Sequence, residues 1–374
     1  MEENEERKPH IIIDNGSGFC KVGFSGDRLP KIVIPSYVGY QRYSRGRVGI
    51  DKKQYFVGAE AEAIKGVLNI NNPIENGVVN NWDDIENIWK YIFENELKVN
   101  PLEYNILFTE TPMNPKENKE KMTQIMFETF NVLGLYIAIE PVLSLYSVGK
   151  FSGIVSDLGE HISYFSPIFY GCILPHAIIK LNFSGNNLTE YMQLLLEENG
   201  KKFSTIAEKE IIKIIKEKSC YVALNYEEEK KTVEKFEYEL PDGTKINIIE
   251  QRIKCPESLF KPQMIGKEEK GIDVACFDSI QKCNINIRKN LFNSIVLSGG
   301  TSMYKGLPER FNKEIKNLSP NLMKEEVKII SPSERKYAVW IGGSILSSTS
   351  SDSLWITKQE YEEYGDLIAH RKCS

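Results

Sequence analysis

Long hydrophobic runs are absent from this sequence. None of its apolar stretches approaches the roughly 18 residues of a membrane-spanning helix. The N-terminal stretch MEENEERKPH is charged and lacks the apolar core of a signal peptide. We therefore expect a soluble protein that has no membrane partner. Its expected location is the cytoplasm, with the nucleus as an alternative.

Patterns typical of metal centres and disulfide frameworks are also missing. The sequence has only four histidines, and its seven cysteines are odd in number, scattered and never arranged as CxxC. These features argue against a zinc site and against a disulfide framework, and they predict reduced thiols. Cys373, beside the C-terminus, is a candidate for an exposed and reactive thiol, although a free thiol without function is the commoner case.

A strong excess of one charge is absent as well. The 47 basic and 52 acidic residues give a net charge of −5, which is too small and of the wrong sign for a typical nucleic-acid-binding protein. Small-molecule or protein partners are therefore expected in place of nucleic acid. The length of 374 residues exceeds the roughly 250–300 residues at which single cores stop growing, so two domains are predicted.

Two segments share one local pattern, in which an apolar run leads through an aspartate into a glycine-containing turn and a second apolar run. The first contains Asp14, Asn15 and Gly16, and the second contains Asp157 and Gly159. Asn-Gly between apolar runs is a strong hairpin signal, because both residues tolerate positive φ. The two aspartates are 157 − 14 = 143 residues apart, about one domain length. We therefore predict a duplicated domain that begins with a strand–turn–strand.

The stretch between the copies alternates strand-like and helix-like patterns. We expect strands at 105–108 and 136–139 and helices at 115–130 and 142–148, with Asn114 able to cap the first helix. This order is typical of an α/β fold and predicts a largely parallel sheet with covered faces.

In the second half, Thr205 and Glu208 form a capping box that opens a helix running toward Leu224. A later strand at 295–298 meets the pair Gly299-Gly300 and is followed by a helix at 307–315. The charge run 227–231 is typical of a solvated loop.

Two acidic hairpin turns are a credible site for a metal–polyphosphate. Backbone N–H groups in tight turns form anion-binding concavities, and Asp14 and Asp157 could each hold a hydrated Mg²⁺. Ser17 and Lys21 could donate hydrogen bonds to phosphate oxygens. Taken alone, each of these patterns is weak, since DNGSG is most often a plain turn and Gly-Gly a packing feature. Neither a Walker motif nor a Rossmann GxGxxG motif is present.

The whole chain closely resembles the actin family. The resemblance is carried, in the family's order and spacing, by IIIDNGSGFCKVGFSGD, NNWDDIENIWKYIF, KEKMTQIMFETFN, IIKEKSCYVALNYE, YELPDG, VLSGGTSMYKGLPER, ERKYAVWIGGSIL and WITKQEYEEYG. It implies two ribonuclease-H-like lobes around a cleft that holds ATP or ADP with Mg²⁺ or Ca²⁺. Residues 1–149 and 337–374 would form the smaller lobe, and residues 150–336 the larger.

The resemblance also implies the ligand contacts. Asp14 and Asp157 would hold the metal through water. The first phosphate loop would comprise Gly16, Ser17, Gly18, Phe19 and Lys21, and the second Asp157, Gly159, Glu160, His161 and Ile162. Phe19 stands for a smaller apolar residue, and Lys213 for the family's arginine. The sugar and adenine would lie against Gly185, Lys213, Lys216, Glu217, Gly299, Gly300, Thr301, Met303, Tyr304 and Lys336.

Departures from the family gather where the chemistry would take place. Glu140, followed by Pro141, stands for the glutamine that orients the attacking water, and Tyr164 stands for the histidine facing that water. The other changes are Glu160 for aspartate, His161 for a glycine against the phosphates and Asn76 for the histidine that is usually methylated. Glu140, Asp157 and Tyr164 are the candidate catalytic residues. Because phosphoryl transfer depends on positioning, we predict retained binding with slow or absent turnover.

The resemblance further implies a cytoskeletal protein that assembles into or modifies filaments with itself or with other actin-like subunits. The subunit-contact loop 39–54 is unusually basic, and the matching plug 264–268 ends in charged residues. Actin-binding proteins would insert at the groove around Tyr146, Gly149, Gly171 and Leu346. One alternative is a structural subunit of a dynactin-type or chromatin-remodelling complex. A small-molecule kinase of the same fold class is disfavoured by the end-to-end resemblance.

Overall fold

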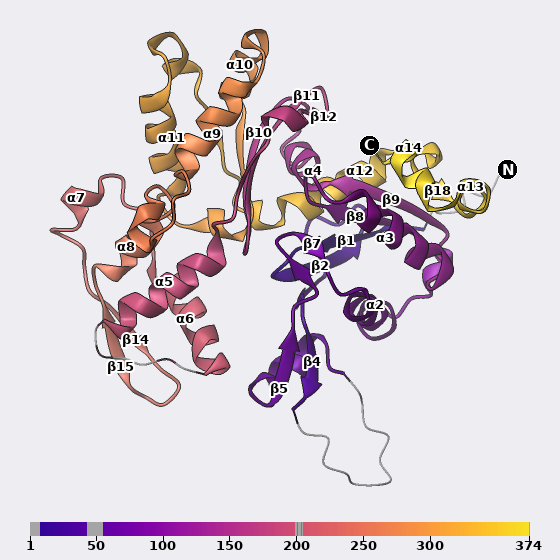
Figure 1. Cartoon of the computed structure of the whole chain (residues 1–374), viewed down its shortest axis with the longest axis horizontal. Helices are drawn as coiled ribbons and strands as arrows, with labels where there is room; N and C mark the ends of the chain where they lie inside the picture. Colours follow the sequence, from indigo (N-terminus) through magenta and orange to yellow (C-terminus); the bar gives the residue numbers. More distant parts are fainter. Residues whose placement is uncertain (1–7, 43–54, 199, 201–202, 204, 374) are drawn as a thin grey trace. The chain divides into compact units, whose positions relative to one another are not determined.

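The computed structural model describes residues 8–42, 55–198, 200, 203 and 205–373. It divides into two compact units, with unit 1 formed by Met1–Lys150 and Tyr337–Ser374 and unit 2 by Phe151–Lys336 (Figure 1). Most of the predicted subunit-contact loop, at 43–54, lies outside the described residues. Within the described ranges, no helix is both long and apolar enough to cross a membrane.

Unit 1 is built on a mixed sheet with the strand order β18-β9-β8-β1-β2-β3. Its strands are β1 Ile11–Asn15, β2 Phe19–Phe24, β3 Ile32–Pro35, β8 Asn105–Glu110, β9 Gly134–Ile139 and β18 Ile356–Thr357. β1, β8 and β9 are parallel, whereas β2, β3 and β18 join them in antiparallel pairs. The prediction of a largely parallel sheet is therefore wrong, because a tight hairpin can connect only antiparallel neighbours.

Unit 2 repeats the arrangement. Its sheet has the order β12-β11-β10-β16-β17, with β13 also paired to β11. The strands are β10 Gly153–Leu158, β11 Ser163–Phe169, β12 Cys172–Ile173, β13 Ile179–Leu181, β16 Ile295–Ser298 and β17 Ile329–Ile330. As in unit 1, an antiparallel hairpin is followed on one side by two parallel strands and on the other by an antiparallel neighbour. This shared topology supports the predicted duplication.

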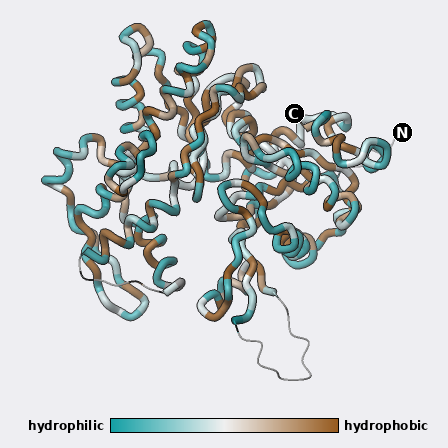
Figure 2. Tube along the Cα trace, in the orientation of Figure 1, coloured by the Kyte–Doolittle hydropathy of each residue, from teal (hydrophilic) through white to brown (hydrophobic). Residues whose placement is uncertain are grey.

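Helices surround each sheet. Unit 1 contains α1 Gly58–Ala63, α2 Trp82–Tyr91, α3 Lys116–Glu128, α4 Glu140–Tyr146, α12 Ala338–Thr349, α13 Lys358–Tyr364 and α14 Ile368–Lys372. Unit 2 contains α5 Gly185–Glu197, α6 Ile206–Ser219, α7 Tyr226–Glu229, α8 Gln251–Glu257, α9 Ile272–Lys282, α10 Ile285–Phe292 and α11 Leu307–Leu318. Figure 2 shows that hydrophobic and hydrophilic stretches alternate along many of these helices.

Three small two-stranded sheets complete the fold. They pair β4 Val38–Gln41 with β5 Leu68–Asn71, β6 Ile74–Glu75 with β7 Val78–Val79, and β14 Phe236–Glu239 with β15 Lys245–Ile248.

The core of unit 1 lies on both faces of its sheet, because successive side chains of a strand point in opposite directions. In β1, Ile11 and Ile13 join the cluster that contains Trp89 of α2, whereas Ile12 joins the cluster that contains Trp340 of α12. Burial on both faces explains why β1 reads as a continuous apolar run. It also holds the turn after β1 on a rigid support.

Several local predictions are confirmed and others are corrected. The capping box of Thr205 and Glu208 opens α6, but the helix ends at Ser219 and does not approach Leu224. The next N–H groups, of Tyr221 and Val222, donate to carbonyls of distant segments and so leave the helical pattern. Asn114 does not cap α3, whose N-cap is Pro115. The charge run 227–231 begins within the short helix α7.

The expectation of an exposed Cys373 is wrong, since this residue is only 1% exposed. Its Sγ accepts a hydrogen bond from Ile137 N–H at 3.3 Å, and its carbonyl oxygen accepts one from Lys119 Nζ. Lys119 also pairs with the buried Glu110 at 2.7 Å. Burial raises the pKa of the Cys373 thiol to about 11, although the Ile137 N–H opposes this shift. A protonated, shielded thiol is a poor nucleophile.

Candidate functional site

The first hairpin holds a buried carboxylate at the end of β1. Asp14 pairs with Lys21 across the hairpin, and Lys21 Nζ lies 2.6 Å from Asp14 Oδ2. Thr109 of β8 donates its hydroxyl to Asp14 Oδ1 at 3.0 Å and accepts the N–H of Asn15 at 3.3 Å. Asp14 is thus oriented by two strands and compensated by one cation. This arrangement brings together the two residues predicted to serve the metal and the phosphates.

The turn of this hairpin is held by a single serine from outside it. Ser36 donates its hydroxyl to Gly16 O at 2.6 Å and its N–H to Gly18 O at 3.1 Å. A Cβ at Gly16 would lie 2.8 Å from Phe19 O, so the tight turn requires glycine there. Carbonyl oxygens that already accept hydrogen bonds do not turn toward an anion. Backbone N–H groups of a tight turn can bind an anion when its carbonyl oxygens are engaged elsewhere.

The second hairpin repeats this device with different donors. Gly159 O accepts hydrogen bonds from Ser184 Oγ at 2.6 Å, Thr301 Oγ1 at 2.7 Å and the N–H of Gly185 at 3.3 Å. The carbonyl of Glu160 accepts the N–H of Asn186 at 2.6 Å. The second loop is therefore seated on the first turn of α5 and on the segment after β16.

Residues predicted to contact the sugar and adenine come together within unit 2. Lys216 Nζ donates to Gly185 O at 2.8 Å and to Thr189 Oγ1 at 2.7 Å, which ties α6 to α5. Lys216, Thr301 and Tyr304 are buried. Other predicted residues on the same segments are exposed, namely Glu217, Gly300, Met303 and Lys336.

A partly buried ion pair links the second loop to α6. Lys213 Nζ lies 3.0 Å from Glu160 Oε1. Burial disfavours the Glu160 carboxylate, but the attraction of Lys213 and Lys216 outweighs it and lowers the pKa of Glu160. Burial likewise opposes the charge of Lys213, yet Glu160 raises the pKa of Lys213. Both groups therefore remain ionised around neutral pH.

Of the other predicted residues of the second hairpin, two pack in an apolar cluster, and one has a polar atom without a hydrogen-bond partner among the described residues. Tyr164 lies opposite Asp157 in the strand pair, so their side chains share one face of the sheet. Tyr164 and Ile162 are buried in an apolar cluster with Ile178. His161 Nδ1 is buried, and within the described part of the chain it has no hydrogen-bond partner.

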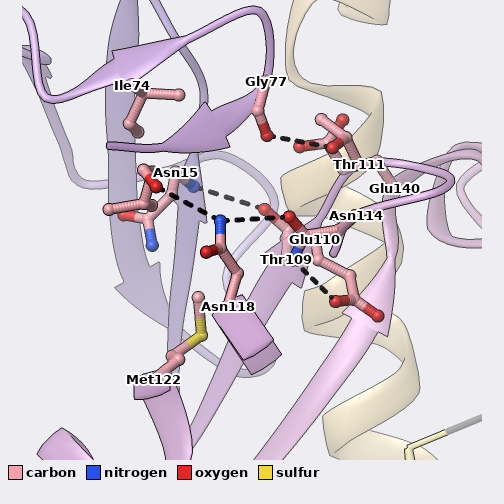
Figure 3. Close-up of a pocket in the computed structure, with 11 residues that line it drawn as sticks. Asn15, Ile74, Gly77, Thr109, Glu110, Thr111, Asn114, Asn118, Met122 and Glu140 are labelled. Carbon is pink, nitrogen blue, oxygen red and sulfur yellow. Dashed lines mark hydrogen bonds between the residues drawn. The ribbon is translucent and has the colours of Figure 1, made fainter. Parts of the chain in front are cut away.

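Glu140, the third candidate catalytic residue, lies in a polar pocket of unit 1 (Figure 3). It begins α4 and is only 8% exposed. The pocket is closed on one side by the β6–β7 hairpin, where Gly77 O accepts the hydroxyl of Thr111 at 3.0 Å. Its polar lining comprises Asn15, Thr109, Glu110, Thr111, Asn114, Asn118 and Glu140. A carboxylate therefore occupies a buried polar site that also includes Asn15 of the first hairpin.

Asn76 occupies the turn of the β6–β7 hairpin and is exposed. Its φ of 52° and that of Gly77, 75°, are both positive. Asn-Gly is the pair that favours this turn, because both residues tolerate the left-handed region. The change from the family's histidine thus suits the local backbone.

Of the predicted partner-binding residues, Tyr146 and Leu346 belong to unit 1, and Gly171 belongs to unit 2. Tyr146 and Leu346 pack partly buried against the α4–α12 side of unit 1. Gly171 of unit 2 donates its N–H to Phe151 O at 2.7 Å. In the predicted plug, Met264 and Ile265 pack partly buried against apolar clusters of unit 2. These two apolar side chains therefore already have partners within their own unit.

Four supporting residues were missed by sequence reasoning. Ser36, Thr109 and Ser184 hold the loops by their hydroxyls, and Arg335 donates to Ser302 O and to Pro332 O beside the glycine pair. Serine and threonine are too common to single out, and these donors lie 20 or more residues from the groups they hold. Ser184 alone carries a local signal, because it forms a capping box with Asn187.

A comparison with protein families gives one match over nearly the whole chain. The family model described as Actin matches residues 5–374. The matched region contains both hairpins, the α5–α6 segment and the glycine pair after β16.

The two residues of the glycine pair, Gly299 and Gly300, should respond differently to substitution by alanine. Gly299 has a φ of 87°, and a Cβ there would lie 2.3 Å from Leu158 O and 2.6 Å from Asp157 Oδ1. Gly299→Ala should therefore destabilise the protein by about 2–4 kcal/mol, measured by chemical unfolding. Gly300→Ala is the control, because a Cβ at Gly300 meets nothing within 4 Å. Equal effects of the two substitutions would contradict this account.

Proposed function

This chain is a member of the actin family, and we propose that it binds ATP with Mg²⁺ or Ca²⁺ and serves as a cytoskeletal protein that assembles into or modifies filaments. The observation that carries the nucleotide part is the pair of hairpin loops. In both, protein donors hold carbonyl oxygens of the turn, and glycine permits the tight conformation. Turns held in this way can offer backbone N–H groups to a polyphosphate, although the N–H of Gly159 itself donates to Ile162 O at 3.1 Å.

The residues present fit the nucleotide and its metal. Asp14 and Asp157 supply carboxylates for water molecules of a hydrated cation, as Mg²⁺ prefers. The cation, when bound, neutralises part of the phosphate charge. Lys21 is held beside Asp14 at 2.6 Å, within the first loop, and can place an ammonium near the phosphates. The buried, unpartnered His161 Nδ1 is a further polar atom in the second loop.

Hydrolysis is proposed to be slow. The groups expected to position water are replaced by Glu140 and Tyr164, and both side chains are buried and packed by their own unit. A carboxylate at position 140 brings negative charge toward the γ-phosphate, and a buried tyrosine cannot shuttle a proton as a histidine does near neutral pH. Misplacement of this kind affects turnover more than affinity.

The first prediction concerns ligand binding. Millimolar ATP with Mg²⁺ should raise the thermal unfolding midpoint, because a ligand selective for the folded state adds about 2.7 kcal/mol at one hundred times Kd. Asp14→Asn and Asp157→Asn should each reduce the part of the shift that depends on Mg²⁺. Asp278→Asn is the control, since Asp278 pairs with Lys270 at an exposed site. No shift of the midpoint in the unsubstituted protein would refute nucleotide binding.

The second prediction concerns turnover. The triple variant Glu140→Gln, His161→Gly and Tyr164→His should release phosphate faster in single-turnover experiments, by up to about 10²–10⁴-fold. ATP affinity should change little. Glu160 is left unchanged because its carboxylate bonds Lys213. The three residues are changed together, since groups that act as one unit are non-additive. An unaltered rate with both proteins monomeric would show that these positions do not limit hydrolysis.

The third prediction concerns assembly. The purified chain with Mg-ATP should sediment as a homopolymer at high speed, and the nucleotide-free protein should remain in the supernatant. Conventional actin should not be incorporated, because charged contacts repeated at every subunit penalise mismatched partners. A chain that stays soluble under all these conditions, and that is recovered from native extract with subunits of a larger complex, would favour a structural role instead.

A further inference from the structure

The second hairpin loop is anchored in two ways. Its backbone is held at the start of α5, where the Ser184 hydroxyl and the N–H groups of Gly185 and Asn186 donate to the carbonyls of Gly159 and Glu160. The side chain of Glu160 reaches instead to α6, where Lys213 Nζ lies 3.0 Å from its Oε1. The loop is therefore held from two different helices.

These contacts form a closed ring of three elements. The loop bonds to the first turn of α5, α5 bonds to α6 through Lys216 and Gly185 O at 2.8 Å, and α6 returns to the loop through Lys213 and Glu160. Lys213 and Lys216 are three residues apart in α6 and so lie on one face of the helix. Opening the Glu160–Lys213 contact would free the loop from α6 and leave it attached to the start of α5 and to Thr301 after β16.

The surroundings of the Glu160–Lys213 ion pair indicate that it affects the position of the loop more than the stability of the protein. The side chains of Lys213 and Glu160 are 16% and 24% exposed, so water screens their attraction only in part. Removal from water offsets much of the attraction, and a buried pair adds little net stability. Such a pair can instead favour one conformation of the loop that it holds. A carboxylate engaged by lysine is also kept from repelling a phosphate.

We propose that Glu160 is a positioning residue that acts through Lys213, holding the second loop so that its N–H groups are arranged for the phosphates before nucleotide arrives. This role rests on the proposed nucleotide binding. The pair also departs from the family at both positions, with glutamate for aspartate and lysine for arginine. The longer acidic side chain is thus matched by a different cation, and each residue is suited to the other.

The test exchanges both partners. Glu160→Asp shortens the acidic side chain by one methylene and should weaken ATP binding about tenfold. The affinity for adenosine, which lacks phosphates, should stay within about twofold, because the role proposed for the loop is to bind phosphates. Adding Lys213→Arg should return ATP affinity to near that of the unsubstituted protein. Glu237→Asp, in the exposed pair of Glu237 with Lys245 at 2.9 Å, is the control and should leave ATP affinity unchanged.

Hydrogen–deuterium exchange of the peptide containing residues 158–163, without nucleotide, supplies an independent readout. Exchange should be faster in Glu160→Asp and should return to the original rate in the exchanged double variant. Unchanged exchange in Glu160→Asp, or a double variant no better than the single one, would overturn the positioning role. If the unsubstituted protein bound no ATP, the proposed function would fail, whereas the exchange rates would still decide whether the ion pair positions the loop.

Discussion

Backbone carbonyl oxygens removed from water must accept hydrogen bonds from the protein, and both hairpin loops depend on this requirement. In each loop the donors include hydroxyl side chains from outside the hairpin, Ser36 in unit 1 and Ser184 with Thr301 in unit 2. Backbone N–H groups from the same segments donate as well. The loops therefore take their shape only when their neighbours are in place.

The two units use the same framework with different electrostatics. In both, an aspartate near the end of a hairpin strand has a hydroxyl residue beside it on the adjacent parallel strand, Thr109 for Asp14 and Ser298 for Asp157. Across the hairpin, however, Asp14 faces Lys21, whereas Asp157 faces Tyr164. The first carboxylate is thus neutralised by its own hairpin. The positive charge near the second loop comes instead from α6, where Lys213 engages Glu160.

The residues that depart from the family are supported by their own surroundings. Glu140 lies in a pocket with Asn114 and Asn118, and Tyr164 is buried in an apolar cluster. Such side chains are positioned by many contacts. Replacing only one of them with the family's residue would leave some of these contacts unsatisfied. Slow chemistry with retained binding is consistent with this division. The two hairpin loops proposed to bind phosphate are held by hydrogen bonds within their own units, while the side chains expected near the attacking water differ from those that the resemblance implies.

Local sequence signals were informative wherever the deciding contacts are close in the chain. The Asp14 hairpin, the capping box of Thr205 and Glu208 and the strand before Gly299 all form as predicted. The hairpin and the capping box are closed by hydrogen bonds between residues near one another in the sequence, so composition and spacing specify them. The strand before Gly299 was recognisable from its apolar run, although its partners in the sheet are the distant strands β10 and β17. The family motifs also allowed the whole fold to be predicted, because they specify the order of all its elements.

Features decided by distant contacts could not be read in the same way. The mixed direction of the sheets, the end of α6 at Ser219 and the burial of Cys373 each depend on partners far along the chain, such as Lys305 for Val222 and Lys119 for Cys373. The same is true of the hydroxyl donors of the loops and of the Glu160–Lys213 pair. The sequence by itself was enough to predict the hairpins, the glycines that their turns require and the family. Only the tertiary structure decided which donors hold the loops, because such bonds form between residues that folding alone brings together.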